Sequence, residues 1–146
     1  MFRRQVPMTT TGMHLAAASG RHENVLEFCV THPNWIRFRD ANDRTPLAMA
    51  LYYGKQNVVD AIFDCPTIPD AAKREALGAL GNRPLAIVED GLRVRPYDDT
   101  DLDQDYDSIR LGLQRSLFRR MVEYLGMAYA QTHSGPLFSE MKSTQD

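Results

Sequence analysis

Apolar residues in the first half of the chain recur at a fixed distance. Residues 11–20 align with residues 45–54 at a shift of 34 residues, the difference between positions 11 and 45, and residues 25–28 align with residues 59–62 at the same shift. The apolar positions of each aligned pair have the spacing of a helix. A repeat of this length predicts units of two short helices that stack, because one unit cannot bury its apolar face alone.

Each unit is predicted to contain two short antiparallel helices. In the first unit, residues 13–17 form a small inner helix, Gly20 ends it, and residues 25–30 supply the apolar face of an outer helix. The inner helices of both units are rich in alanine, at Ala16, Ala17, Ala48 and Ala50. Side chains this small let neighbouring helices approach closely, so the units can share one core.

The inner-helix segments resemble the signature Thr-Pro-Leu-His-Leu-Ala-Ala of the ankyrin repeats. The corresponding segments in this chain are Thr11-Gly-Met-His-Leu-Ala-Ala17 and Thr45-Pro-Leu-Ala-Met-Ala50. By this resemblance, Gly20 and Gly54 lie at the turn between the two helices of a unit, and residues 34–44 correspond to the hairpin loop between two units. The resemblance implies a short stack of helical pairs that binds other proteins.

The chain departs from the family pattern at three places. Residues 21–24 contain one extra residue, Gly12 stands where proline usually opens the inner helix, and Asp43 stands where the hairpin turn usually has glycine. Aspartate tolerates the left-handed backbone conformation better than most residues, and one added residue in an exposed turn has a small entropic cost. The resemblance therefore holds over residues 9–65.

The region after the second unit has two interpretations. Residues 70–80 are rich in Ala, Lys and Glu and are predicted to form a helix. Residues 84–95 form either another short helix closed by Gly91 or a β-hairpin that turns at the same glycine. We favour the helix, because the spacing of the glycines suits continued stacking. Residues 70–91 then make a degenerate third unit.

The last third of the chain contains an acidic segment and then a long amphipathic helix. Residues 96–107 are predicted to be an exposed loop, and its aspartates are Asp98, Asp99, Asp101, Asp103, Asp105 and Asp107. Residues 108–133 have apolar positions three to four apart and predict one helix that caps the open end of the stack. Partner binding or dimerisation through this helix is the alternative. Residues 134–146 are predicted to be disordered.

The predicted fold class is therefore all-α, a short ankyrin-like α-solenoid of stacked helix-turn-helix repeats with a C-terminal capping helix. The predicted repeat stack covers residues 9–95, and its three units lie at about 11–44, 45–69 and 70–91. The acidic loop follows at 96–107, then the capping helix at 108–133 and the tail at 134–146.

Composition and charge narrow the partners. The chain is 43% apolar and 25% charged, which is typical of one soluble globular domain. A net charge of -2 creates no overall field toward nucleic acid or an anionic membrane. No apolar run approaches the roughly 20 residues of a membrane span. Cys29 and Cys65 are too few for a disulfide scaffold. We expect a cytoplasmic protein; the alternative is a protein that is delivered to, or shared with, the nucleus or a host cell. We also expect it to be a monomer or a weak homodimer.

The sequence contains no recognisable catalytic or metal-binding pattern. Asp101, Asp103 and Asp105 alternate as in a calcium loop, but Tyr106 replaces the turn glycine and Gly112 replaces the bidentate glutamate. The histidines are scattered without the i, i+4 spacing of a metal pair, and no GxSxG, Walker or dinucleotide glycine motif is present. We therefore expect no catalytic residue, no metal, no cofactor and no enzyme activity.

The family resemblance implies a binding surface made of hairpin tips and the ends of inner helices. The residues assigned to it are Ser19, Arg37, Arg39, Asn42, Arg44, Tyr52 and Tyr53. Tyrosine and arginine are enriched at interface hot spots, and a local basic and aromatic patch favours an acidic segment of another protein as ligand. Packing of either tyrosine inside the fold is the alternative.

Three functions fit these observations. The first is an adaptor or effector that docks a protein through this surface. The second is a dedicated inhibitor of an enzyme that uses the acidic loop or the same surface. The third is a structural protein that assembles through its C-terminal helix.

Overall fold

The computed structural model describes residues 9–81, 83–94 and 106–133, and this part of the chain is all-helical. The elements in chain order are α1 (Gly12–Ala18), α2 (His22–Thr31), the 3-10 helix η1 (Pro33–Arg37), α3 (Pro46–Tyr52), α4 (Gln56–Asp64), α5 (Asp70–Gly78), α6 (Pro84–Val94), α7 (Tyr106–Leu125) and α8 (Met127–His133).

The first two helical pairs begin and end at equivalent positions of the repeat. The side chains of Thr11 and Thr45 cap α1 and α3 by accepting hydrogen bonds from the backbone N–H groups three residues further on. Gly20 and Gly54 follow these helices with φ angles of 76° and 71°, a conformation that a residue without Cβ adopts easily. The same caps and turns therefore build both α1–α2 and α3–α4.

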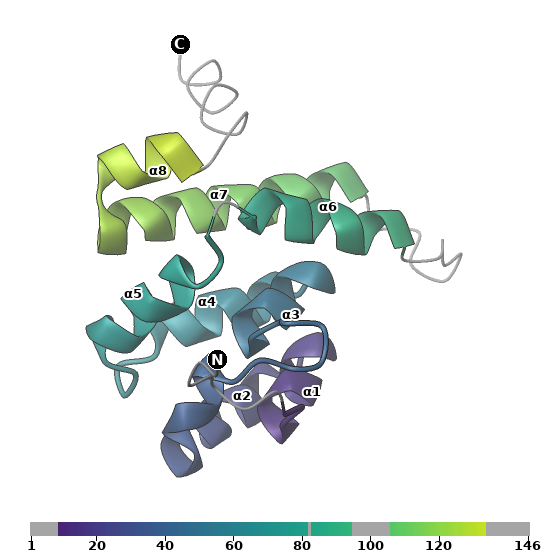
Figure 1. Cartoon of the computed structure of the whole chain (residues 1–146), viewed down its shortest axis with the longest axis vertical. Coiled ribbons are helices and arrows are strands. Elements are labelled where there is room, and N and C mark those ends of the chain that lie inside the picture. Colours follow the sequence, from purple (N-terminus) through teal and green to yellow (C-terminus); the bar gives the residue numbers. More distant parts are fainter. Residues whose placement is uncertain (1–8, 82, 95–105, 134–146) are drawn as a thin grey trace, which may run out of the picture.

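The helical pairs lie on one another in layers, as Figure 1 shows. Helix α3 packs between α1 and α6, while α4 packs between α2 and α7. Helix α8 packs on α7, beyond the last pair. The interior contains Met13, Leu47, Leu51, Ile62, Phe63, Leu113 and Leu117. One continuous core thus runs from the first pair to the last, because each layer contributes side chains to it.

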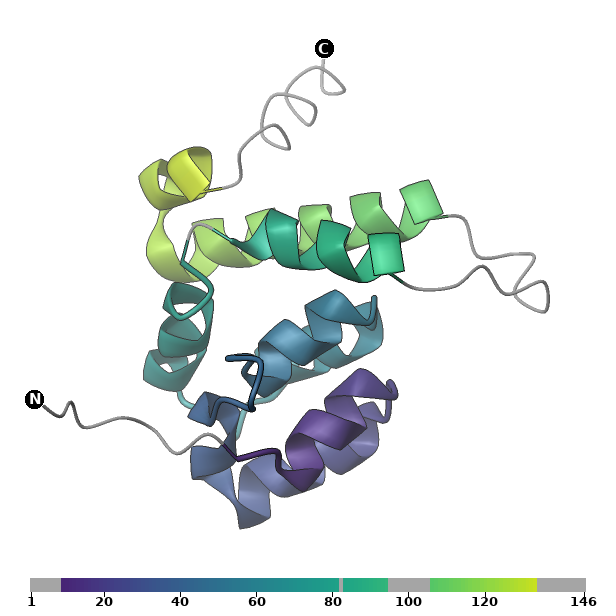
Figure 2. The same ribbon diagram turned by 45° about the vertical axis from the view of Figure 1, so that its right-hand side comes forward.

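The third helical pair differs from the expected third unit at 70–91. Residues 84–94 form helix α6, which confirms the helix and excludes the hairpin, but this helix continues past Gly91 to Val94. Helix α6 packs on α3 and on α7, so its partner in the stack is α7. Helix α5 instead contacts η1 and α7 and lies beside the stack, as Figure 2 shows. The third pair of the stack is therefore α6 with α7, and α5 belongs to the connection between α4 and α6.

The C-terminal region is also divided differently from the single predicted helix at 108–133. Gly126 has a φ angle of 97° and separates α7 from α8. The break lets α8 fold back onto α7, where Ala130 is buried. Helix α7 already begins at Tyr106, inside the predicted acidic loop. Residues 96–105 of that loop and the predicted disordered tail lie outside the described residues.

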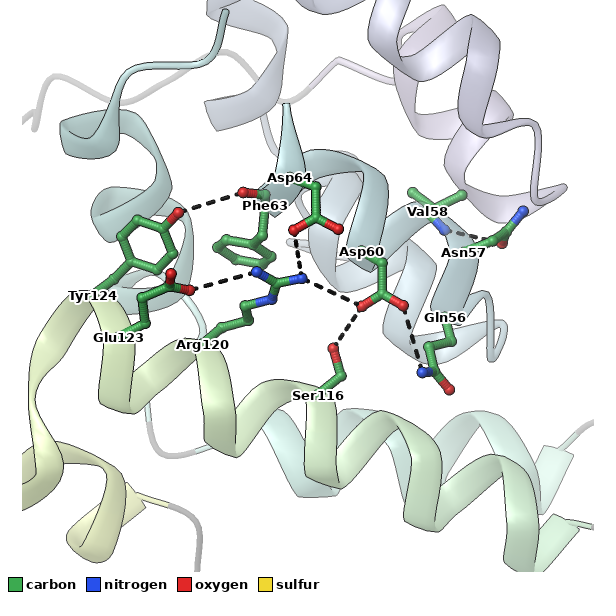
Figure 3. A network of polar contacts seen from close by, with 10 residues as sticks. All are labelled: Gln56, Asn57, Val58, Asp60, Phe63, Asp64, Ser116, Arg120, Glu123 and Tyr124. Atoms are coloured by element: carbon green, nitrogen blue, oxygen red, sulfur yellow. Dashed lines mark hydrogen bonds and ion pairs between the residues drawn. The ribbon is translucent and has the colours of Figure 1, made fainter. Parts of the chain in front are cut away.

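Polar contacts join α7 to α4, and Arg120 is at their centre, as Figure 3 shows. Its Nη2 lies 2.8 Å from Asp64 Oδ1 and 3.8 Å from Asp60 Oδ1, and its Nη1 lies 3.5 Å from Glu123 Oε1. The Ser116 hydroxyl donates to Asp60 over 2.9 Å. The Arg120 side chain is only 6% exposed, whereas those of Asp64 and Glu123 are 65% and 54% exposed.

Replacement of Arg120 separates its packing role from its charge. We expect Arg120→Ala to lower the free energy of unfolding by about 2 to 3 kcal/mol, because it leaves a cavity over Phe63 and removes the ion pairs. Arg120→Met is expected to cost about 1 kcal/mol less, because Met fills the space and the exposed carboxylates return to water. Urea unfolding measures both values. Equal losses in the two variants would contradict a packing contribution.

Candidate protein-binding surface

The hairpin between η1 and α3 is held in shape by Asp40, which is 4% exposed. Its Oδ1 accepts hydrogen bonds from the backbone N–H groups of Asn42 and Arg44, over 2.9 and 3.0 Å. Asp43 has a φ angle of 63°, which confirms that aspartate takes the left-handed position of this turn. The tip at residues 41–43 is exposed on this fixed support.

His14 ties the hairpin to α1. The Thr11 backbone N–H donates to His14 Nδ1 over 3.1 Å, so Nδ1 is an acceptor and Nε2 carries the ring proton. Nε2 then donates to the carbonyl oxygens of Arg44, at 2.8 Å, and Phe38, at 3.1 Å. Burial lowers the pKa of His14 below its ordinary value, although the carbonyls of Arg44 and Phe38 and the charge of Asp40 act in the opposite direction. The imidazole is therefore a neutral structural link.

Arg44 and the two tyrosines form an aromatic and basic group. The guanidinium carbon of Arg44 lies 3.8 Å from the centroid of the Tyr52 ring. The rings of Tyr52 and Tyr53 meet edge to face, with centroids 5.1 Å apart. Tyr52 is half-buried and Tyr53 is 40% exposed, so neither side chain is fully buried in the core. This arrangement restricts the side chains before any partner arrives.

Arg37 and Arg39 line a separate pocket of about 120 Å³. Ile36 and Thr45 contribute to the same wall, and α5 supplies the opposite wall. The residues from α5 are Ala72, Glu75, Ala76 and Ala79. Arg39 also lies 3.5 Å from the Asp43 carboxylate. The pocket lining thus combines alanine and isoleucine side chains with charged groups of both signs.

The seven residues assigned to the surface are only partly brought together. Two groups lie around one hairpin, namely Arg44 with Tyr52 and Tyr53, and Arg37 with Arg39. Asn42 is exposed at the hairpin tip. Ser19 is the C-cap of α1, and its hydroxyl donates to the Leu15 carbonyl over 2.6 Å. Ser19 therefore has a local structural role and joins neither group.

Sequence reasoning missed the contribution of α5 to this surface. Glu75 and the alanines of α5 line the same pocket as Arg37 and Arg39, although α5 was assigned to a stacked unit. Its Ala-rich composition predicted a helix but contained no signal for its neighbour, because the neighbour depends on how the connection folds across η1.

Other kinds of site receive no support from the part of the chain that the structure describes. Within residues 9–81, 83–94 and 106–133, no group of three or more His, Cys, Asp or Glu side chains could hold a metal ion. In the same ranges no helix has the length and apolar character needed to cross a membrane. Asp101, Asp103 and Asp105 of the acidic segment are outside these ranges.

The surface is thus characterised by its own geometry and chemistry. Comparisons with protein-family models, with curated proteins and with solved structures found no match.

Proposed function

We propose that the chain is a non-enzymatic adaptor or effector of the ankyrin type, which binds an acidic segment of another protein in the cytoplasm. The binding surface, called the hairpin surface below, consists of Arg37, Arg39, Asn42, Arg44, Tyr52 and Tyr53. The observation that carries this proposal is the stack of Arg44 on Tyr52 beside the exposed ring of Tyr53.

The stack suits a carboxylate ligand for two reasons. A guanidinium held over a ring by cation–π attraction still has N–H groups that can bind a carboxylate through two hydrogen bonds. The ring also limits the conformations of Arg44, so binding costs less side-chain entropy. Among the described residues, no carboxylate forms an ion pair with Arg37 or Arg44, whereas Arg39 reaches Asp43. A partner carboxylate would supply the missing counter-charge.

The pocket beside the hairpin adds shape selection. A volume of about 120 Å³ suits one side chain of the partner. Its alanine and isoleucine lining favours an aliphatic group, and its two arginines outnumber the one carboxylate, Glu75, so that they favour a neighbouring acid. The preferred ligand is therefore a short segment in which an acidic residue flanks an aliphatic one.

Charge reversal tests this proposal once a partner has been captured and identified. We expect Arg39→Glu combined with Arg44→Glu to weaken binding by about 30-fold or more, because two attractive contacts become repulsive. Isothermal titration calorimetry with the purified partner measures the affinity. The matched control is Arg115→Glu with Arg119→Glu on α7, which makes the same charge change on exposed residues of another face.

The control outcomes distinguish the competing functions. Equal loss in both double variants would contradict the assignment of this partner to the hairpin surface. Loss only after neutralisation of Asp101, Asp103 and Asp105 would favour the inhibitor that uses the acidic segment. A concentration-dependent dimer that disappears when α7 is altered would favour the self-assembling protein.

A further inference from the structure

A second surface lies on the outer helices, away from the hairpin. An open groove of about 1000 Å³ runs along α7, with α4 on one side and the start of α8 at its end. Its lining, called the outer groove below, consists of Gln56, Asp64, Gly112, Arg115, Ser116, Phe118, Arg119, Arg120, Val122, Glu123 and Met127. Helices α4 and α7 stack with α2, whereas α3 stacks with α1 and α6, so this groove and the hairpin surface are separate.

The charges in the outer groove are unevenly matched. Its two carboxylates, Asp64 and Glu123, both bind Arg120. Arg115 and Arg119 are exposed, and within the described part of the chain neither forms an ion pair. They lie four residues apart on one helix, so the two positive charges repel each other. The groove consequently presents two adjacent cations that have no counter-charge among the described residues.

An apolar row runs beside these cations. Phe118 and Val122 are half-buried, and Met127 is 48% exposed. Phe118 and Val122 are four residues apart, so they lie one turn from each other, as Arg115 and Arg119 do. Methionine is flexible and adapts to different apolar partners. The groove thus presents a basic row on α7 beside an apolar row that continues from α7 to the start of α8.

Helix α7, which carries most of both rows, is held on α4 by side-chain hydrogen bonds and ion pairs. The bonds of Arg120 to Asp64 and of Ser116 to Asp60 hold the middle of α7 on α4. The Tyr124 hydroxyl donates to the Phe63 carbonyl over 3.4 Å near the end of the helix. A ligand would therefore meet preformed rows, and little of its binding free energy would be used to order the site.

We propose that the outer groove binds an amphipathic acidic helix of a partner protein. Two carboxylates one turn apart on that helix pair with Arg115 and Arg119, and apolar side chains on its adjacent face contact Phe118, Val122 and Met127. A protein helix fits better than a membrane or nucleic acid, because it can present carboxylates and apolar side chains at the same one-turn spacing as the two rows of the groove. This inference does not depend on the hairpin surface.

The test uses a designed helical peptide with Glu at two positions four apart and Leu along the neighbouring face. Its control peptide has Lys in place of both Glu residues. Fluorescence anisotropy with the full chain is expected to show binding of the acidic peptide and at least about tenfold weaker binding of the Lys peptide, because opposite charges face each other only in the first complex. Failure of the acidic peptide to bind at its solubility limit would overturn the proposal.

Variants of the chain locate the binding site. Arg115→Glu with Arg119→Glu is expected to weaken binding of the acidic peptide by about tenfold or more, and Met127→Glu is expected to weaken it by about threefold to tenfold. The side chains are exposed, so thermal unfolding should stay unchanged and shows that each variant is folded. Arg39→Glu with Arg44→Glu should leave peptide binding intact. Loss in that control instead would place the peptide on the hairpin surface and overturn the outer groove.

Two further probes separate a partner helix from other anionic ligands. Vesicles with phosphatidylserine and a short DNA duplex are expected to bind more weakly than the acidic peptide, with no dependence on Met127. Tighter binding of either probe, lost in the Arg115→Glu and Arg119→Glu variant, would overturn the proposal in favour of a membrane or nucleic-acid surface.

Discussion

Gly91→Ala is expected to lower the free energy of unfolding by about 3 kcal/mol or more, because it forces two stacked helices apart. A Cβ atom at Gly91 would lie 1.7 Å from the backbone carbonyl oxygen of Tyr52. Backbone atoms of a packed helix cannot rotate away, so α6 must move from α3 and the core opens between them. Thermal or urea unfolding measures the loss.

Two other glycines are graded controls for this substitution. A Cβ atom at Gly78 meets nothing within 4 Å, so Gly78→Ala is expected to stabilise the protein by about 0.5 to 1 kcal/mol through helix propensity. A Cβ atom at Gly112 would lie 2.4 Å from Gln56 Oε1, the end of a flexible side chain that can move. Gly112→Ala should therefore fall between the two. Equal effects at the three sites would contradict close packing at Gly91.

His14→Leu is expected to lower the free energy of unfolding by about 2 to 4 kcal/mol at pH 8, because it leaves buried hydrogen-bonding groups without partners. The groups affected are the Thr11 N–H and the carbonyls of Phe38 and Arg44. Urea unfolding measures the loss. A change below about 0.5 kcal/mol would contradict the role of His14 as a link between α1 and the hairpin.

The same residue gives a pH dependence with a defined sign. Burial lowers the pKa of His14 in the folded state below its ordinary value of 6.5. The unfolded chain therefore binds a proton first as the pH falls through 6.5, and this contribution to stability is present above 6.5 and declines below it, by at most about 1.4 kcal/mol per pH unit. His14→Leu retains the other histidines and should remove this component. An unchanged pH profile in the variant would contradict the assignment.

The hairpin surface was partly predictable. Arg44 and Tyr52 were both expected on this surface, because the repeat places Arg44 just before the inner helix α3 and Tyr52 at the end of that helix. The pocket at Arg37 and Arg39 was not expected, since its second wall comes from α5. Ser19 was assigned to the surface by the resemblance, but its hydroxyl is used within α1.

Local chemistry in the sequence by itself determined the helical pairs and their ends. Thr11 and Thr45 cap the helices that follow them, Gly20 and Gly54 turn the chain, and Asp43 takes the left-handed turn position. These features depend on interactions between residues only a few positions apart, so a single sequence contains all the information needed to predict them.

Only the tertiary structure decided which helices complete the stack. Helix α6 packs on α3 because Gly91 leaves room for the Tyr52 carbonyl, and α7 packs on α4 because Arg120 reaches Asp64 across 56 residues of sequence. Helix α5 therefore lies beside the stack, and the outer groove lies where α7 meets α4. Contacts between distant residues depend on the shape of surfaces that exist only after the chain has folded, so no local pattern specified them.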